Sequence, residues 1–262
     1  ETRASAYYQA DSINFSYSGE TDNGLTVTQK VELELTRLFP SAKIVRLDRD
    51  TAKTAKQTES KLNEFKSVGD IMIGTQMIAK GHHIESVTLV GVLGIDTTLN
   101  IPDFRSSERA FQLLTQVAGR AGRGDHSGHV IVQTHHPDHY AICHAKSHDY
   151  TRFFEEEISY REPFQYPPFN RLINIILSST TRPSLSAYGS VLNDFLEDKL
   201  PEHPRIGPKP APIEKIRDHY RWHVLIKASH DELTEIKSIF SSRPMAPKDV
   251  RVITDFDPYH IL

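Results

Sequence analysis

The sequence has 262 residues, with 31 lysines and arginines against 34 aspartates and glutamates, which gives a formal net charge of −3. A chain without an overall basic field binds nucleic acid only through local patches of positive charge. The single cysteine, Cys143, excludes an internal disulfide framework and a cysteine-cluster zinc site. No apolar run approaches the ~18 residues needed to cross a membrane, and residues 1–23 do not resemble a signal peptide. We therefore expect a soluble, cytoplasmic chain.

Residues 24–148 are predicted to alternate helices with strands, after a leader at residues 1–23 that has no clear periodicity. Thr26 and Gln29 have the spacing of a capping box at the start of a helix that Pro40 ends. Strands alternating with helices favour a parallel α/β sheet, and nearly continuous apolar strands fit a sheet covered on both faces. The strands are expected at 44–47, 71–75, 87–93 and 130–133, and further helices around Leu62 and Phe65, at 106–118 and after Pro137.

Residues 149–262 show a different order of predicted strands and helices and are predicted to form a second, smaller α+β domain. An acidic stretch at 152–162 indicates a connecting helix, so the domain boundary is placed near residue 148. A proline-rich loop is expected at 201–212, with room for a short strand at 213–216. This order of elements favours a split βαβ arrangement. The other strands are expected at 172–177, 222–226 and 250–253, and the helices at 184–200 and 231–240.

A cluster of glycine and arginine follows the predicted helix at 106–118. It consists of Gln116, Gly119, Arg120, Gly122 and Arg123. Glycine lets the backbone approach a ligand closely, and arginine offers a planar, permanently charged fork that suits phosphate oxygens. Two arginines on one turn can hold a γ-phosphate and stabilise the charge that develops in phosphoryl transfer. The glutamine can contact the nucleotide or sense the attacking water. The alternative is a solvent-exposed helix C-cap.

This cluster resembles motif VI, Q-x-x-G-R-x-x-R, of superfamily 2 helicases. Upstream, the segment that follows the predicted strand at 71–75 resembles motif V, whose hydroxyl, backbone and lysine groups contact the phosphates of a single strand. The alternative for that segment is a simple turn from strand to loop. The resemblance assigns catalysis to Gln116, Arg120 and Arg123, nucleotide binding to Gly91, Asp96, Gly119 and Gly122, and DNA binding to Thr75, Gln76, Lys80 and Gly81.

The run from Asp96 to Arg109 resembles the D-x-x-L-x-x-P-D-F-R-x-x-E-R pattern of the PriA family of replication-restart helicases. The resemblance covers about residues 24–262. It implies a second RecA-like helicase lobe followed by the C-terminal domain of a translocase that moves 3′ to 5′ on DNA and uses ATP with Mg²⁺. It also implies recognition of stalled forks, partnership with single-stranded-DNA-binding protein and other primosome proteins, and a monomer. Further resembling segments lie at 154–157, 166–171, 220–222 and 255–258.

Two features depart from that family. No G-x-x-x-x-G-K-[ST] motif is present, so the chain alone is expected to lack ATPase activity and to be a fragment that supplies arginines to a nucleotide held elsewhere. The family also binds two zinc ions through eight cysteines, and those ligands are missing here, so no metal site is expected. A non-catalytic module that docks DNA and protein remains the alternative, and a histidine-based metal hydrolase is a remote third.

Residues 203–227 form a locally basic segment, with six lysines and arginines against two acids and hence a local charge of +4. Such a segment suits DNA phosphates or an acidic peptide. The alternative is a solvated edge strand whose charges discourage aggregation. The family docks its partner protein's acidic tail here through an Arg-x-Arg-Trp-Gln run. In this chain, His219 and His223 stand in place of the flanking Arg and Gln of that run. We assign DNA binding to Arg217, Arg221 and Lys227, and partner binding to His219, Trp222 and His223.

Overall fold

The computed structural model describes residues 26–48, 50–75, 87–119 and 128–261. These residues form two compact units. The first unit runs to Ile101 and resumes from Arg105 to Phe154, whereas the second combines Pro102–Phe104 with the chain from Glu155 onward. The division falls inside the helix α7 (Tyr150–Arg161), which begins just after the predicted boundary near residue 148.

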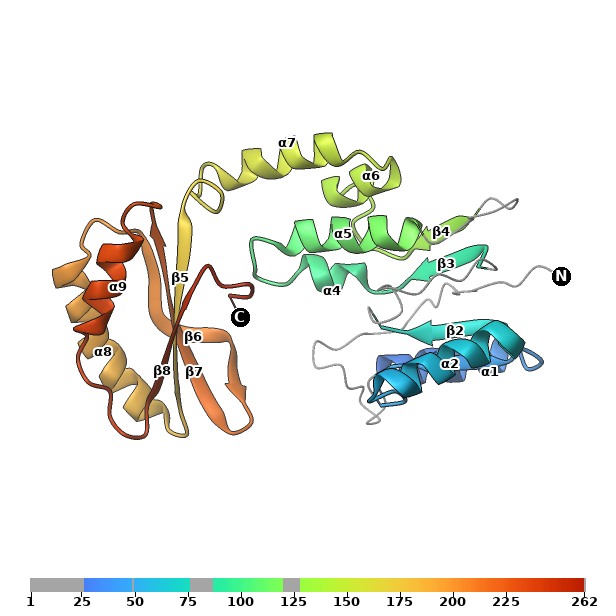
Figure 1. Cartoon of the computed structure of the whole chain (residues 1–262), viewed down its shortest axis with the longest axis horizontal. Coiled ribbons are helices and arrows are strands. Elements are labelled where there is room, and N and C mark those ends of the chain that lie inside the picture. The colour runs from blue at the N-terminus through green and yellow to red at the C-terminus, as the bar shows by residue number, and fades with distance from the viewer. Residues whose placement is uncertain (1–25, 49, 76–86, 120–127, 262) are drawn as a thin grey trace. The chain divides into compact units, whose positions relative to one another are not determined.

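The first unit alternates helices and strands as predicted (Figure 1). Strand β1 pairs in parallel with β2, and β3 pairs in parallel with β4, so the expected α/β class is confirmed. The elements are α1 (Val27–Leu38), β1 (Ile44–Leu47), α2 (Ala55–Val68), β2 (Ile71–Gly74), β3 (Leu89–Val92), α4 (Ile95–Leu99), α5 (Ser106–Ala118), β4 (His129–Val132) and α6 (Tyr140–Lys146).

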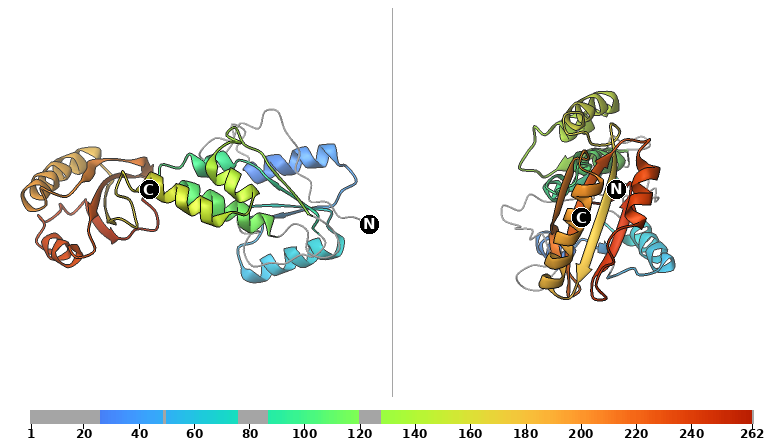
Figure 2. Two further views of the ribbon diagram at one scale, coloured as in Figure 1. Left: turned by 90° about the horizontal axis from the view of Figure 1, so that it is seen from above. Right: turned by 90° about the vertical axis from the view of Figure 1, so that its left-hand side faces the viewer.

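The β1–β2 pair is covered on both faces, because its side chains alternate between two hydrophobic clusters. Ile71 and Ile73 pack with α1, whereas Met72 between them packs with α2. Figure 2 shows these two helices on opposite sides of the strands. This is the two-sided burial that the apolar strands predicted. The α1 cluster is built on Val31, Leu35, Ile71 and Ile73, and the α2 cluster on Val45, Leu47, Ala52, Leu62, Phe65 and Met72.

Local sequence signals set the helix ends in this unit. Thr26 caps α1 and Gln29 closes the predicted capping box, with the Gln29 side-chain oxygen accepting from the Thr26 N–H at 2.7 Å. Helix α5 has the predicted bounds, and its inner side includes Phe111, whose ring stacks on Phe153 with centroids 4.1 Å apart. The packed inner side fixes the direction in which the end of α5 points.

The second unit has the predicted split βαβ order. Its four antiparallel strands are arranged β6-β7-β5-β8, which places the first and third strands at the centre. The split βαβ prediction is therefore confirmed. The elements are β5 (Arg171–Ser179), α8 (Arg182–Lys199), β6 (Arg205–Ile216), β7 (His219–Ala228), α9 (Leu233–Ser241) and β8 (Arg251–Phe256).

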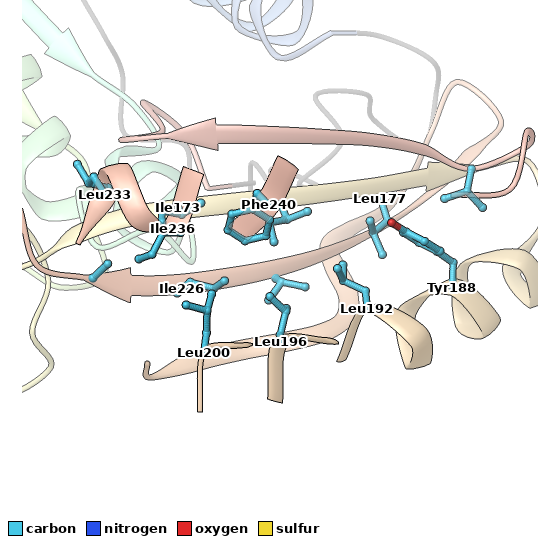
Figure 3. Packing of buried hydrophobic residues seen from close by; sticks show 14 of the residues in the cluster. Ile173, Leu177, Tyr188, Leu192, Leu196, Leu200, Ile226, Leu233, Ile236 and Phe240 are labelled. Carbon is cyan, nitrogen blue, oxygen red and sulfur yellow. The ribbon is translucent and has the colours of Figure 1, made fainter. Parts of the chain in front are cut away.

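Both helices of the second unit pack on the same face of its sheet (Figure 3). Leu192 and Leu196 of α8 and Ile236 of α9 are at most 1% exposed in this shared core. Alternate residues of β5 and β7 supply the sheet side of the core, so the residues between them lie on the opposite face. The sheet residues of this core are Ile173, Ile175, Leu177, Val224, Ile226 and Ala228.

The predicted loop at 201–212 is wrong, because β6 begins at Arg205. Proline has no N–H to donate, so a proline-rich run disfavours a central strand. β6 lies at the edge of the sheet, where one side of the backbone needs no partner strand. Its pairing with β7 shifts register twice, between Ile206 and Lys209 and between Pro210 and Lys215. The edge position and these irregularities accommodate the prolines.

No helix in the described ranges is both long enough and apolar enough to cross a membrane.

Candidate functional site

The end of α5 presents part of the glycine–arginine cluster to solvent. Gln116 and Gly119 are exposed, whereas Val117 between them is buried. A Cβ placed on Gly119 would lie 3.5 Å from the Thr115 carbonyl oxygen, an ordinary contact, so the described neighbours do not require glycine here. The bare backbone instead leaves room for a ligand to approach. Arg120, Gly122 and Arg123 lie outside the described residues.

The start of the motif V segment lies at the carboxyl end of β2. Thr75 follows Gly74 directly and is exposed. Ligands in open parallel α/β sheets bind at the carboxyl ends of strands, so this position suits contact with a phosphate backbone. Gln76, Lys80 and Gly81 lie outside the described residues.

The sequence reasoning missed a buried carboxylate beside this edge. Asp48 follows β1, and since Leu47 pairs with Gly74, Asp48 and Thr75 continue from neighbouring strand ends. Asp48 is 4% exposed and accepts hydrogen bonds from the Thr28 hydroxyl at 2.6 Å and from the Thr51 N–H at 3.0 Å. An aspartate followed three residues later by threonine, just after a strand, is the local signal from which such a turn could have been predicted.

The pKa of Asp48 lies below its ordinary value. Burial alone would raise this pKa, but the hydrogen bonds from Thr28 and Thr51 and the charge of Arg46 outweigh it. Arg46 in turn forms an ion pair with Glu32 of α1, with nitrogen and oxygen 2.5 Å apart. The ionised carboxylate therefore ties α1, β1 and the following turn together at the edge where motif V begins.

Gly91 and Asp96, both assigned to nucleotide binding, have structural tasks. Gly91 is buried inside β3, where it pairs with Ile131 of β4. Asp96 accepts hydrogen bonds from the Thr134 hydroxyl at 2.7 Å and the His135 N–H at 3.1 Å. Asp96 thus holds the turn that follows β4, and direct contact of either residue with a nucleotide stays a prediction.

The three residues of the second unit assigned to DNA binding are not brought together. Arg217 occupies the turn between β6 and β7 with φ 47°, and Arg221 lies within β7. Lys227 lies six residues further along the same strand, at a distance of ~20 Å in extended chain. The Lys227 ammonium donates to the Phe164 carbonyl and lies 4.1 Å from the Tyr166 ring centroid, and burial lowers its pKa. Lys227 therefore has a packing role at the far end of the strand.

The three residues assigned to partner binding are divided between the two faces of the sheet. Trp222 lies on the helix-covered face, where a Cβ on Gly189 of α8 would come within 3.1 Å of its ring. His219 and His223 lie on the opposite face, as the alternation of β7 requires. Burial lowers the pKa of His223, and the nearby charges of Lys209 and Arg221 act in the same direction. The structure thus places His219 and His223 on one face of the sheet and Trp222 on the other.

Aromatic and cationic side chains form a layered stack within the second unit. The Phe104 and Tyr166 rings stack with their centroids 4.9 Å apart. The guanidinium of Arg161 lies over the Phe104 ring, 5.0 Å from its centroid. Phe104 and Tyr166 pack against a small cluster of Leu172, Leu225 and Ile261. The sequence signal was present, because Phe104 belongs to the P-D-F-R run, but its packing partner could not be inferred from spacing. The stack covers one end of the sheet face opposite the helices.

Comparison with known proteins separates the same two parts. Residues 13–125 match the helicase conserved C-terminal domain, and residues 162–259 match the primosomal protein N C-terminal domain. The replication restart protein PriA of Bacillus subtilis is 41% identical over 245 residues, which cover 90% of this chain. The chain belongs to the PriA family. The predicted RecA-like lobe followed by a C-terminal domain is confirmed, while the boundary near residue 148 stays a prediction.

Two other relatives show similar identity over a similar share of this chain. The replication restart proteins PriA of Synechocystis and of Haemophilus influenzae are 38% and 36% identical, over 89% and 88% of this chain. The matched part covers only 30%, 28% and 32% of the Bacillus, Synechocystis and Haemophilus relatives. The chain therefore spans about a third of the length of the relatives it matches.

The residues present do not fit the zinc sites that the family resemblance implies. A structural zinc site needs four cysteine or histidine ligands, whereas the sequence contains one cysteine, Cys143, which is exposed on α6. Among the described residues, no group of three or more histidine, cysteine, aspartate or glutamate side chains is placed to hold a metal ion.

Proposed function

We propose that this chain provides the second motor lobe and the C-terminal domain of an ATP-dependent 3′–5′ DNA helicase that recognises stalled forks and restarts replication. Membership of the PriA family and the two matched domains support this proposal. The observation that carries the motor role is the end of α5. The inner side of α5 is buried in the core, whereas Gln116 and Gly119 are exposed. In the sequence these two residues come just before Arg120 and Arg123.

In this proposal, Arg120 and Arg123 bind the γ-phosphate of ATP, and Gln116 contacts the nucleotide. The exposed, side-chain-free backbone of Gly119 fits close approach by a phosphate. ATP with Mg²⁺ supplies the phosphoryl transfer that drives movement on DNA. Since the sequence has no P-loop motif, the groups that cradle the nucleotide belong to a first lobe outside this sequence.

The test replaces each arginine in the full-length protein. Arg120→Ala and Arg123→Ala are each expected to leave ATP binding largely intact and to lower DNA-stimulated hydrolysis by ~10³-fold, the usual scale for an arginine finger. Arg152→Ala is the matched control, because Arg152 lies on α7 and its side chain is 76% exposed. Normal turnover in both cluster variants would refute the assignment.

The same proposal gives DNA binding to the motif V segment through Thr75, Gln76, Lys80 and Gly81. Substrates would be branched and single-stranded DNA, in the cytoplasm where the chromosome replicates. Partners would be single-stranded-DNA-binding protein, docked near His219 and His223, and other primosome proteins. Trp222 leaves this partner set because it packs against α8. A monomer is the expected state.

A second candidate function is a DNA- and protein-docking module without catalysis. The observation that favours it is the absence of G-x-x-x-x-G-K-[ST] from the sequence. The isolated chain should then bind DNA in a salt-sensitive manner and hydrolyse no ATP. ATP turnover by the purified chain would refute this candidate.

A further inference from the structure

The chain crosses between the two units and back within a few residues. It leaves the first unit after Ile101, contributes Pro102–Phe104 to the second unit, and returns to the first unit at Arg105. We call Pro102–Phe104 the bridging segment. Helix α5 begins at Ser106, just beyond this segment, and ends at the glycine–arginine cluster. The bridging segment therefore joins the second unit to the helix that carries the candidate catalytic residues.

The chain on either side of the bridging segment is fixed in the first unit. The Ser106 hydroxyl donates to the Ile101 carbonyl at 2.5 Å, so a hydrogen bond closes the loop that contains the segment. Further along α5, Ala110 and Leu114 are at most 4% exposed in the core of the first unit. Helices that are packed in this way are rigid elements of the kind that carry energetic coupling between distant sites.

The bridging segment itself is packed into the second unit. Asp103 is 7% exposed, and the Phe104 ring stacks on Tyr166 with centroids 4.9 Å apart and planes within 6° of parallel. Phe104 also packs against Leu172 and Leu225, which are both at most 4% exposed. Burial raises the pKa of Tyr166, and the nearby charge of Asp103 acts in the same direction. The second unit thus holds the segment mainly through the Phe104 side chain.

A cation lies against each of the two rings. The Arg161 guanidinium is 5.0 Å from the Phe104 centroid and is held in place by an ion pair with Glu157 at 2.6 Å. The Lys227 ammonium is 4.1 Å from the Tyr166 centroid. Stacked rings attract each other and nearby cations through the ring quadrupole, which favours particular geometries. The hold on the bridging segment is therefore directional, beyond what apolar burial alone provides.

We propose that the bridging segment couples the second unit to ATP hydrolysis, with Phe104 as a positioning residue. The inference rests on the proposed function, because it requires DNA-stimulated hydrolysis and the arginines that follow α5. The restraint that DNA imposes on the second unit reaches the start of α5 through the stack of Phe104 on Tyr166. Helix α5 then carries this restraint to the glycine–arginine cluster at its other end. Phe104 touches neither ATP nor DNA and acts through α5.

The alternative is that Phe104 only fills space at one end of the sheet. A side chain with that role would change the stability of the second unit and nothing else in the folded protein. A coupling residue instead changes the response of hydrolysis to DNA in a protein that remains folded. The two roles are separated by comparing hydrolysis with and without DNA.

The test removes the ring–ring contact from either side in the full-length protein. Phe104→Leu and Tyr166→Leu are made singly and together, because leucine remains apolar but cannot stack. Phe104→Tyr is the conservative variant that keeps the ring. The control combines Phe154→Leu with Tyr160→Leu, which removes the same two ring types from positions of α7 that are 49% and 54% exposed. ATP hydrolysis is measured over a range of ATP concentrations, with and without single-stranded DNA, and circular dichroism checks folding.

Each single leucine variant should lower the maximal DNA-stimulated rate roughly tenfold, within the usual range of coupling effects. The rate without DNA and the half-saturating ATP concentration should stay unchanged, because the groups that cradle ATP lie elsewhere. The double variant should lose no more than either single variant, since both substitutions remove the same contact. Phe104→Tyr and the control pair should keep the unsubstituted rates.

Unchanged DNA-stimulated rates in both leucine variants would overturn the inference and leave the proposed function in place. Equal losses with and without DNA would also overturn it, because the role would then be structural. So would a loss of about a hundredfold in the double variant, which would show two independent effects. If Phe104→Leu fails to fold, Tyr166→Leu decides by the same rates. Absence of DNA-stimulated hydrolysis in the unsubstituted full-length protein would refute the proposed function and the inference with it.

Discussion

The two units place their candidate functional residues in different ways. In the helicase lobe the candidates lie where elements end, at Thr75 after β2 and at Gly119 after α5. In the C-terminal domain they lie within strands, where the alternation of β7 sends Arg221 and His223 to one face and Trp222 to the other. Element ends suit a nucleotide that must be approached closely by backbone, whereas a strand face suits an extended ligand.

The same difference explains what the sequence could predict. Apolar periodicity and capping signals predicted the helices and strands of the lobe except the short α4, including the bounds of α5, because burial on both sheet faces leaves a strong pattern. The edge strand β6 was not predicted, because its prolines favour a loop. Only the strand order shows that β6 lies at the edge of the sheet, where prolines are tolerated. Topology was needed to show that its outer side requires no partner.

The candidate functional residues follow a parallel rule. Sequence motifs pointed to Gln116 and Gly119 as candidates, because a resemblance rests on local runs of sequence, and their role in nucleotide binding stays a prediction. Asp48 was not recognised from the sequence, because its hydrogen-bond partner Thr28 is 20 residues away in another element. Trp222 was grouped with His219 and His223 by proximity in sequence, which a strand does not preserve in space.

The largest expected effect concerns the hydrophobic core that α8 and α9 share with the sheet of the second unit. Leu196→Ala should destabilise the second unit by about 3 kcal/mol, because it removes a fully buried side chain of α8 from the core that both helices share with the sheet. The single tryptophan, Trp222, lies in this core, so its fluorescence during urea unfolding reports the change. Val191→Ala, at a residue 47% exposed on the same helix, is the control and should change stability by less than about 0.5 kcal/mol. Equal effects of the two substitutions would contradict the described packing.

A smaller effect is expected at the strand edge of the lobe. Asp48→Asn should cost about 2 kcal/mol, because it weakens several hydrogen bonds to an ionised, buried carboxylate. Since the folded pKa of Asp48 is lowered, its contribution is present above the ordinary pKa of 3.8 and is lost as pH falls through the folded value. Thermal unfolding followed by circular dichroism between pH 7 and pH 3 should therefore show a gap between the two proteins that narrows in acid. A constant gap would contradict the role of the charge.

The smallest effect concerns pH and the C-terminal domain. The folded pKa of His223 is lowered, so the unfolded chain binds a proton more readily and stability falls as pH drops below the ordinary value of 6.5. His223→Gln should remove that part of the pH dependence, because glutamine does not titrate. The comparison is the change in unfolding midpoint between pH 7.5 and pH 5.5 for the two proteins. An identical change in both would show that burial does not hold His223 neutral.

The most direct test of the central claim separates ATP hydrolysis from DNA binding in the full-length protein. ATP hydrolysis by Arg123→Ala is followed across a titration with single-stranded DNA, beside the Arg152→Ala control. The account predicts a maximal rate lowered by ~10³-fold with the half-saturating DNA concentration unchanged, because the arginine acts on the nucleotide and not on the DNA. A normal maximal rate, or a change confined to the half-saturating DNA concentration, would contradict it.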